Sequence, residues 1–309
     1  MSIFNHPAWI KVLEKTYNYK FEKFVVDSEE IYFYKKNNLK LTYYSHLPFS
    51  DEISISNQKN FIEIIERIIN NNENVKIEIR TNLEYDKFDK IQVGYNHKLY
   101  LEPSLDEIFH SFKKTQVQQP ITKSLKEGLL YKISEEKIDL LQFYNLHLIT
   151  RKRLGVPIQP KKFFLNFFDE IISKKSGFIV NVFHKDKVIS SGVFMGYSND
   201  LIYKFSASDP KYLNLRPNNL MLWGAIQEAK KRGFKFFNFG RTDLNAEGLR
   251  KFKQGWGTVE EPLIYSYYPK APDVSKFNFI KDKIIKPFIK YSPKFVCRLS
   301  GELFYKYFG

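Results

Sequence analysis

Three short apolar runs that follow one another in the second half of the chain are the sequence feature that most restricts its possible folds. Residues 178–183, 188–195 and 201–206 are rich in aromatic and β-branched side chains and are separated by polar turns, which predicts three successive strands. The amphipathic stretch 218–232 then predicts a helix, and 234–239 a further strand. A meander followed by a helix and a strand excludes a helical bundle and indicates a mixed α/β domain.

The first half of the chain shows a similar order of elements. Its apolar periodicity predicts a strand meander, an isoleucine-rich helix and a further strand, at residues 21–26, 31–34, 39–44, 61–69 and 75–80. A chain of 309 residues also exceeds the usual size of a single core. We therefore expect a mixed α/β (α+β) fold with two tandem domains, each a mixed β-sheet flanked by helices, at residues 1–118 and 119–270, followed by a helical tail at 271–309.

Basic residues are in large excess, with a formal net charge of +15. Such a charge indicates an acidic partner such as nucleic acid, a phosphate-rich cofactor or an anionic membrane, although a lysine-rich composition explains it equally well. Arginine is less evenly spread than lysine, since six of the nine Arg residues lie between positions 151 and 250. Because a guanidinium binds phosphate or carboxylate through two parallel hydrogen bonds, this cluster indicates an anion site in the second half.

The cysteine and histidine patterns argue against disulfides and metal sites. Cys297 is the single cysteine, and the six histidines show no metal-ligand spacing, so we expect no metal and no permanently bound cofactor. The first residues do not resemble a signal peptide, and no apolar run approaches the roughly 18 residues of a membrane span. These features predict a cytoplasmic protein.

The start of the helix predicted at 218–232 is a candidate cofactor site. Asn218 or Asn219 could cap this helix, and Arg216 lies just upstream. Unpaired N–H groups at a helix N-terminus stabilise an anion, so these three residues are candidate cofactor-binding residues. An ordinary capped helix with a solvated arginine is the alternative.

Two further motifs follow the strand predicted at 234–239. Arg241 and Asp243 come directly after its end, where ligands often bind in open α/β sheets, so Arg241 is a candidate substrate anchor. A salt bridge between the two without any function explains them equally well. Lys253 then lies between a phenylalanine and Trp256, and an amine in apolar surroundings could stabilise developing oxyanion charge. A surface lysine beside a packed tryptophan is the alternative.

Several spaced motifs extend over about residues 5–268. In the second half they are Phe143 to Pro157 with Phe163-Phe164, Pro217-Asn218-Asn219-Leu220 to Trp223, Phe239-Gly240-Arg241-Thr242, and Phe252-Lys253 to Trp256-Gly257. In the first half they are His6-Pro7-Ala8-Trp9 and Leu47-Pro48-Phe49-Ser50. In this combination they resemble the FemAB-related branch of the GNAT-like acyltransferases.

This resemblance implies two tandem GNAT-like domains and an enzyme, either an N-acyltransferase or an aminoacyltransferase. Members of the family move an aminoacyl group from aminoacyl-tRNA, or an acyl group from a carrier such as acyl-CoA, onto an amine, and the expected acceptor is a sugar or peptide precursor of the cell envelope. Lys253 would assist at the reacting carbonyl, and Arg241 and Arg151 would belong to the substrate cleft. The candidate residues are thus Lys253 and Arg241 for catalysis, and Arg151, Arg153, Asp243 and Trp256 for substrate binding.

Two departures from the family pattern leave the donor open. Residues 212–218 lack the Gly-rich turn by which GNAT enzymes bind the pyrophosphate of coenzyme A. The second half also contains no long charged insert of the kind that forms a coiled-coil arm in the peptidoglycan bridge enzymes.

The tail at 271–309 combines basic and aromatic residues. Its lysines alternate with apolar positions, which suits helices that lie on the inner face of an anionic membrane, although helices packed on the protein's own core explain the same pattern. The charge and the tail also favour a rival function, a non-catalytic protein that binds nucleic acid or a membrane surface. Against this rival, the arginines concentrate at strand ends, and no RNA-binding module signature is present.

Overall fold

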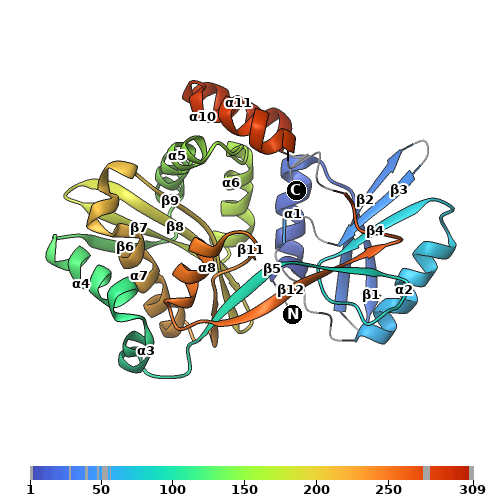
Figure 1. Ribbon diagram of the computed structural model, residues 1–309, viewed down its shortest axis with the longest axis horizontal. Coiled ribbons are helices and arrows are strands. Elements are labelled where there is room, and N and C mark those ends of the chain that lie inside the picture. Colours follow the sequence, from blue (N-terminus) through green and yellow to red (C-terminus); the bar gives the residue numbers. More distant parts are fainter. Residues whose placement is uncertain are drawn as a thin grey trace.

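One mixed β-sheet runs through both halves of the molecule and carries helices on its faces (Figure 1). The computed structural model describes residues 3–27, 29–38, 41–46, 49–50, 55, 57–273 and 279–305. Within these residues the sheet has twelve strands in the order β1-β2-β3-β4-β12-β5-β10-β9-β8-β7-β6, with β11 paired to β5. The strands are β1 (Phe21–Val26), β2 (Glu29–Asn38), β3 (Leu41–His46), β4 (Val75–Ile79), β5 (Asp89–Tyr100), β6 (Leu130–Ser134), β7 (Gly177–His184), β8 (Lys187–Tyr197), β9 (Asp200–Ser208), β10 (Phe236–Asn238), β11 (Thr242–Asp243) and β12 (Val259–Tyr268).

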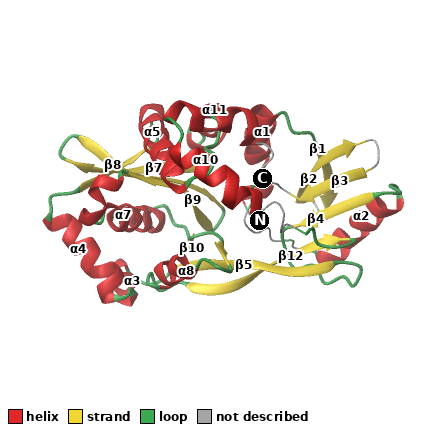
Figure 2. Ribbon diagram, turned by 45° about the horizontal axis from the view of Figure 1, so that its top comes forward, coloured by secondary structure: helices red, strands yellow, loops and turns green. Residues whose placement is uncertain are grey.

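The long strands β5 and β12 join the two halves. They pair antiparallel from Val259 opposite Lys98 to Tyr267 opposite Asp89. At one end β12 also pairs with β4, whereas at the other end β5 pairs with β10. The sheets of the two halves are therefore continuous, and Figure 2 shows β5 and β12 crossing from one half to the other.

Helices cover both faces of the sheet in the second half. Side chains of β7 alternate between the faces, so that Ile179 packs in one core with α1, α5 and α6, whereas Phe178 and Val180 pack in another with α4 and α7. In the first half, Phe61 and Ile65 of α2 pack onto β2, β3 and β4. The described α-helices are α1 (Pro7–Tyr17), α2 (Gln58–Asn70), α3 (Leu105–Ser111), α4 (Gln119–Lys126), α5 (Lys137–Leu154), α6 (Lys161–Phe167), α7 (Pro217–Lys231), α8 (Glu247–Gln254), α10 (Lys286–Tyr291) and α11 (Lys294–Phe304).

The predicted class, a mixed sheet flanked by helices, is confirmed. The helical segment between β5 and β6 is divided into α3, a π-helical turn (Lys114–Gln118) and α4, because Phe112 has an extended backbone and ends α3. The strand predicted at 39–44 falls partly outside the described residues, and so do Leu47 and Pro48 of the N-terminal motif.

The predicted domain boundaries at residues 118 and 270 stay a prediction. Segments on opposite sides of these boundaries pack together in the same hydrophobic cores. Helix α1 packs on α6 although the two belong to different halves of the sequence. Ile108 and Phe112 likewise join the core beneath α7. Conversely, the end of β12 completes the sheet of the first half. None of the helices within the described residues is long and apolar enough to cross a membrane.

Replacing Gly94 by alanine should destabilise the centre of the sheet. A Cβ atom on Gly94 of β5 would lie 2.2 Å from the carbonyl oxygen of Thr242 in β11, so one of the two strands would have to move. We expect the free energy of unfolding, measured by urea denaturation, to fall by about 1–3 kcal/mol. Gly248→Ala in α8 is the control, because nothing lies within 4 Å of its added Cβ, and it should be neutral or slightly stabilising. Equal stability of the two variants would contradict this account.

Candidate active site

A cavity of about 380 Å³ lies where α1, α5 and α6 meet β9, the loop after β10 and α8. Its described lining contains nine aromatic side chains, four basic side chains and no carboxylate. The basic residues are Arg151, Lys204, Arg241 and Lys253. Because low-dielectric aromatic walls strengthen the field of these cations, the cavity suits a ligand with anionic groups or a reaction that develops negative charge.

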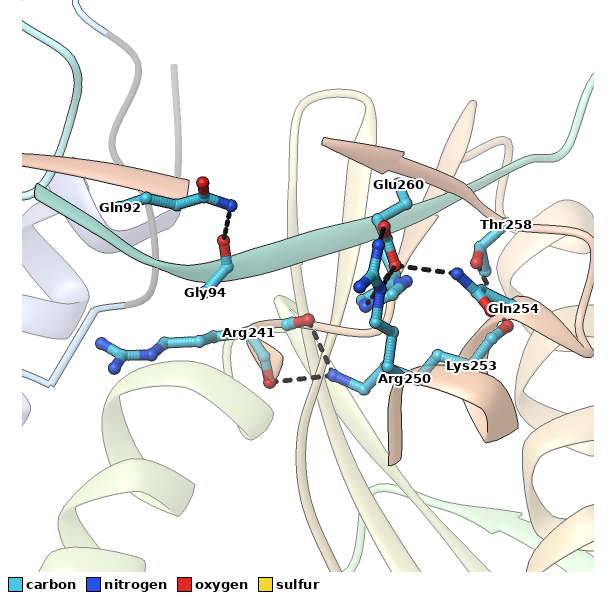
Figure 3. Close-up of polar contacts among 10 residues, drawn as sticks. Gln92, Gly94, Arg241, Arg250, Lys253, Gln254, Thr258 and Glu260 are labelled. Atoms are coloured by element: carbon cyan, nitrogen blue, oxygen red, sulfur yellow. Dashed lines mark hydrogen bonds and ion pairs between the residues drawn. The ribbon is translucent and has the colours of Figure 1, made fainter. Parts of the chain in front are cut away.

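Lys253 on α8 is the most constrained of these cations. Lys253 is only 4% exposed. Its Nζ donates hydrogen bonds to the carbonyl oxygens of Gly240 at 2.8 Å and Arg241 at 2.9 Å (Figure 3). The two carbonyls converge on the amine because Gly240 has a left-handed backbone, with φ at 71°. The ammonium group is therefore fixed at the wall of the cavity.

Helix α8 is attached to strand β12 through Glu260. Arg250 donates to this carboxylate from Nε at 2.8 Å and from a terminal nitrogen, and Gln254 donates from Nε2 at 3.1 Å. The Arg250 guanidinium also lies 3.9 Å from the centre of the Tyr95 ring in β5. The hydrogen bonds from Arg250 lower the pKa of Glu260, which keeps the carboxylate ionised. The hydrogen bonds from Arg250 and Gln254 to Glu260, visible in Figure 3, hold the helix that carries Lys253.

Arg241 extends from the same loop in another direction, and its side chain points away from the Lys253 amine in Figure 3. Its Nε donates to Asp243 Oδ1 at 2.8 Å, and a terminal nitrogen donates to the carbonyl oxygen of Val93 at 3.3 Å. Its side chain is 33% exposed, whereas that of Asp243 is 69% exposed. Asp243 thus orients Arg241 from the solvent side and is not part of the cavity lining.

Arg151 lies at the end of α5 and braces the loop that follows it. Its Nε and a terminal nitrogen donate to the same carbonyl oxygen, that of Pro157, at 2.8 and 2.6 Å. Two residues further on, Gln159 also lines the cavity and accepts a hydrogen bond from Nε2 of the buried His147 at 2.9 Å. Burial, together with nearby Arg151, lowers the pKa of His147 to about 3, so this imidazole is a neutral structural support.

The structure brings Arg151, Arg241 and Lys253 to one cavity, and it places the other predicted residues elsewhere. Arg153 is exposed outside the lining. Trp256 is fully buried and packs against Phe112 and Phe239 in the core beside α7. Its contribution is packing, and its predicted contact with substrate stays a prediction.

The start of α7 is built differently from the prediction. Neither Asn218 nor Asn219 caps the helix, which begins at Pro217 after Arg216 in a left-handed conformation. Asn218 Oδ1 instead accepts a hydrogen bond from Ser190 Oγ at 2.7 Å, and Asn219 Nδ2 donates to the carbonyl oxygen of Gln116 at 3.3 Å. The predicted cap is wrong, because both amides bind neighbouring elements, and a role of Arg216, Asn218 and Asn219 in cofactor binding stays a prediction.

Several residues of the lining were missed in the sequence. Lys204 of β9 donates to the carbonyl oxygen of Phe49 at 2.7 Å, and its Nζ lies 4.7 Å from the centre of the Phe4 ring. Its neighbour Tyr203 has a pKa raised to about 12 by burial, so its phenol stays protonated and can donate. Tyr305, directly after α11, closes one side of the cavity. The alternation of β9 could have indicated Lys204, but no local pattern marks Tyr305.

His147→Phe should weaken the loss of stability at acidic pH. Burial holds His147 neutral in the folded protein with a pKa of about 3, below its ordinary value of 6.5. The unfolded chain therefore binds the proton more tightly, and the stability present above pH 6.5 is lost as the pH falls.

The measurement is the free energy of unfolding in urea at pH 7 and at pH 4.5. The decrease between the two should be about 2 kcal/mol smaller in His147→Phe than in the unmodified protein. An unchanged decrease in His147→Phe would show that this histidine does not set the pH dependence.

Part of this chain is similar in sequence to known proteins. The model of the FemAB family matches residues 172–268. A lipid II:glycine glycyltransferase of Staphylococcus saprophyticus is 32% identical over 120 residues, which are 36% of this chain and 29% of that protein. A lipid II:glycine glycyltransferase of Staphylococcus haemolyticus is 23% identical over 206 residues, 64% of this chain and 44% of that protein. The matched part of the chain thus spans less than half the length of either relative.

Solved structures extend the likeness to nearly the whole chain at the level of the fold. The crystal structure of FemX matches over 89% of this chain and 93% of the FemX chain, with a TM-score of 0.67 and 15% identity. The structure of L-PGS from Bacillus licheniformis matches over 86% of this chain and 89% of the L-PGS chain, with a TM-score of 0.56 and 12% identity. The family match over residues 172–268 and the likeness of the fold to FemX thus agree with the resemblance to the FemAB family that the spaced motifs indicated.

Proposed function

We propose that this protein transfers an acyl or aminoacyl group onto an amine of a cell-envelope precursor. The observation that carries the proposal is the cavity in which the fixed ammonium group of Lys253 faces aromatic walls and three further cations, with no carboxylate in the described lining. Acyl transfer to an amine passes through a tetrahedral intermediate whose oxygen carries negative charge. A preorganised donor at the wall of an aromatic-lined cavity suits that charge.

In the proposed reaction, the nitrogen of the acceptor attacks the carbonyl carbon of an activated ester or thioester. A carbon–nitrogen bond forms, and the electrons of the carbonyl move to an oxygen near Lys253 Nζ. The intermediate then expels the alcohol or thiol of the donor, which leaves with the proton that the amine gives up. Since the described lining holds no carboxylate, we assign two tasks to the protein, the orientation of the reactants and the stabilisation of charge. The proton is passed directly between the two substrates.

We assign to Arg151 and Arg241 the binding of anionic groups on the two substrates. Both donors considered, acyl-CoA and aminoacyl-tRNA, carry phosphates, and peptide precursors carry carboxylates. Each guanidinium is oriented by the protein, Arg151 by the carbonyl of Pro157 and Arg241 by Asp243. A braced guanidinium loses less conformational freedom on binding and favours a planar anion.

We favour aminoacyl-tRNA as the donor and a peptidoglycan precursor as the acceptor. The names of the staphylococcal relatives describe glycyl transfer to lipid II, and their similarity supports the same class of reaction here. The 3-10 turn at Pro210–Leu215, which precedes α7, also lacks the glycines of a coenzyme A pyrophosphate loop. Aminoacyl-tRNA and acyl-CoA are both made in the cytoplasm, so we place the reaction on that side of the membrane.

A transfer assay with the purified protein tests this function. A labelled mixture of aminoacyl-tRNAs or a set of acyl-CoAs is incubated with peptidoglycan precursors that carry a free side-chain amine. We expect label to reach the precursor from aminoacyl-tRNA and not from acyl-CoA. Transfer from acyl-CoA would overturn the donor, and transfer from neither, with retention of tRNA or of vesicles, would favour the rival binding protein.

Lys253→Met should lower kcat by about 10²–10³-fold with a smaller change in KM, because it removes a donor used mainly in the transition state. Lys251→Met on the same helix is the matched control, since this lysine is exposed and absent from the cavity lining, and it should keep full turnover. Lys253→Arg keeps a cation but displaces the donor and should not restore kcat. Unfolding midpoints verify that the variants are folded, and full turnover of Lys253→Met would refute the assigned role.

A further inference from the structure

The last described helices expose an unusually apolar surface. Of the nineteen large hydrophobic residues that are exposed in the described chain, eight lie between positions 279 and 303. We call these eight the outer face; they are Phe279, Ile280, Ile284, Phe288, Tyr291, Phe295, Leu299 and Leu303. Helical periodicity places them together, since Ile284 and Phe288, or Phe295, Leu299 and Leu303, are four residues apart. An apolar surface of this density indicates an interaction site.

The opposite face of the same helices already packs on the protein. Ile289 and Cys297 are buried in the core with α5 and α6. Gly301 approaches the carbonyl oxygen of Ile158 so closely that a Cβ atom there would lie 2.0 Å from it. Glu302 accepts a hydrogen bond from the backbone N–H of Lys161 at 3.0 Å, at the first residue of α6. Core packing therefore explains the inner residues of these helices and leaves the outer face without an internal role.

Basic side chains surround the outer face. The exposed charged residues between positions 279 and 303 comprise six basic ones, Lys281, Lys283, Lys286, Lys290, Lys294 and Arg298, and two acidic ones, Asp282 and Glu302. One of the acids lies 3.8 Å from Lys286, and the other faces α6. Long basic side chains that border aromatic and aliphatic ones match the headgroup region of an anionic bilayer, where the charges meet phosphates and the apolar groups enter the acyl boundary.

We propose that the outer face docks on an anionic membrane surface, with the helix axes along the plane of the membrane. A second copy of the chain would place like charges opposite one another, so the lipid surface is the occupant that the charges favour. Figure 1 shows α10 and α11 as a layer outside α5 and α6, on the outside of the molecule.

The same helix connects this surface to the cavity. Tyr305 follows α11 directly, lines the cavity and stacks on Phe49, with ring centres 5.6 Å apart. Docking through the outer face therefore holds α11, whose following residue Tyr305 lines the cavity, against the membrane that would carry a lipid-linked acceptor. The docking itself does not rest on the transfer reaction and is measured without it.

Co-sedimentation of the full-length protein with vesicles tests the proposal. Vesicles of phosphatidylcholine mixed with phosphatidylglycerol should bind it at least about tenfold more tightly than vesicles of phosphatidylcholine alone, and high salt should weaken the binding. Replacing both Phe288 and Phe295, 60% and 68% exposed, by serine should reduce binding to anionic vesicles about tenfold or more. The matched control replaces Leu130 and Ile138, 71% and 63% exposed on β6 and α5, by serine and should bind normally.

Three results would overturn the proposal: no binding of the unmodified protein to anionic vesicles, equal binding of the Phe288 and Phe295 variant, or an equal loss in the control variant. Light scattering of the free proteins tests the alternative occupant, a second copy of the chain. A dimer that is lost only in the Phe288 and Phe295 variant would assign the outer face to that second copy. Circular dichroism and urea unfolding show whether each variant is folded. A protein that binds vesicles but transfers nothing would keep this proposal and refute the transferase.

Discussion

The antiparallel pairing of β5 with β12 is the interaction on which the arrangement of this protein depends. From Val259 opposite Lys98 to Tyr267 opposite Asp89, the two strands extend the sheet of one half into that of the other. Breaking this ladder would separate the backbone N–H and C=O groups of the two strands from their partners. The halves therefore share one continuous sheet, and α8 and the loop after β10, which line the cavity with α1, α5 and β9, are attached to these two strands.

The position of Lys253 follows from this pairing. Strand β12 carries Glu260, which holds α8 through Arg250 and Gln254, and β5 pairs with β11, which fixes the loop that presents the carbonyls of Gly240 and Arg241. A buried ammonium group is costly unless it is hydrogen-bonded, and here both its helix and its acceptors are attached to the same two strands. Such a donor needs little reorganisation when a carbonyl oxygen becomes charged, which is what electrostatic stabilisation requires.

Most strands and helices could be predicted from the sequence, because their apolar residues recur at the period of the structure that they form. Strand β5 could not, since Gly94, Asn96, His97 and Lys98 interrupt any apolar alternation and its pairing partners lie far away in the sequence. Arg241 and Lys253, which line the cavity, were indicated by their place after a strand and among aromatics. Lys204 and Tyr305 were missed, because the cavity gathers them from β9 and from the end of α11, which only the tertiary fold brings together.

The family match and the cavity cover different parts of the chain, and the difference bears on specificity. Residues 172–268 include Lys204, Arg241 and Lys253, the groups that face the proposed reaction centre. Other walls come from outside this segment, from Trp9 and Tyr17 of α1, Arg151 of α5 and Tyr305. A catalytic group must meet the same carbonyl in every relative, whereas the outer walls meet whatever the substrate carries beyond it. If the proposed transfer occurs at Lys253, differences in substrate between this chain and its relatives are therefore expected to arise at α1, α5 and Tyr305 rather than within the matched segment.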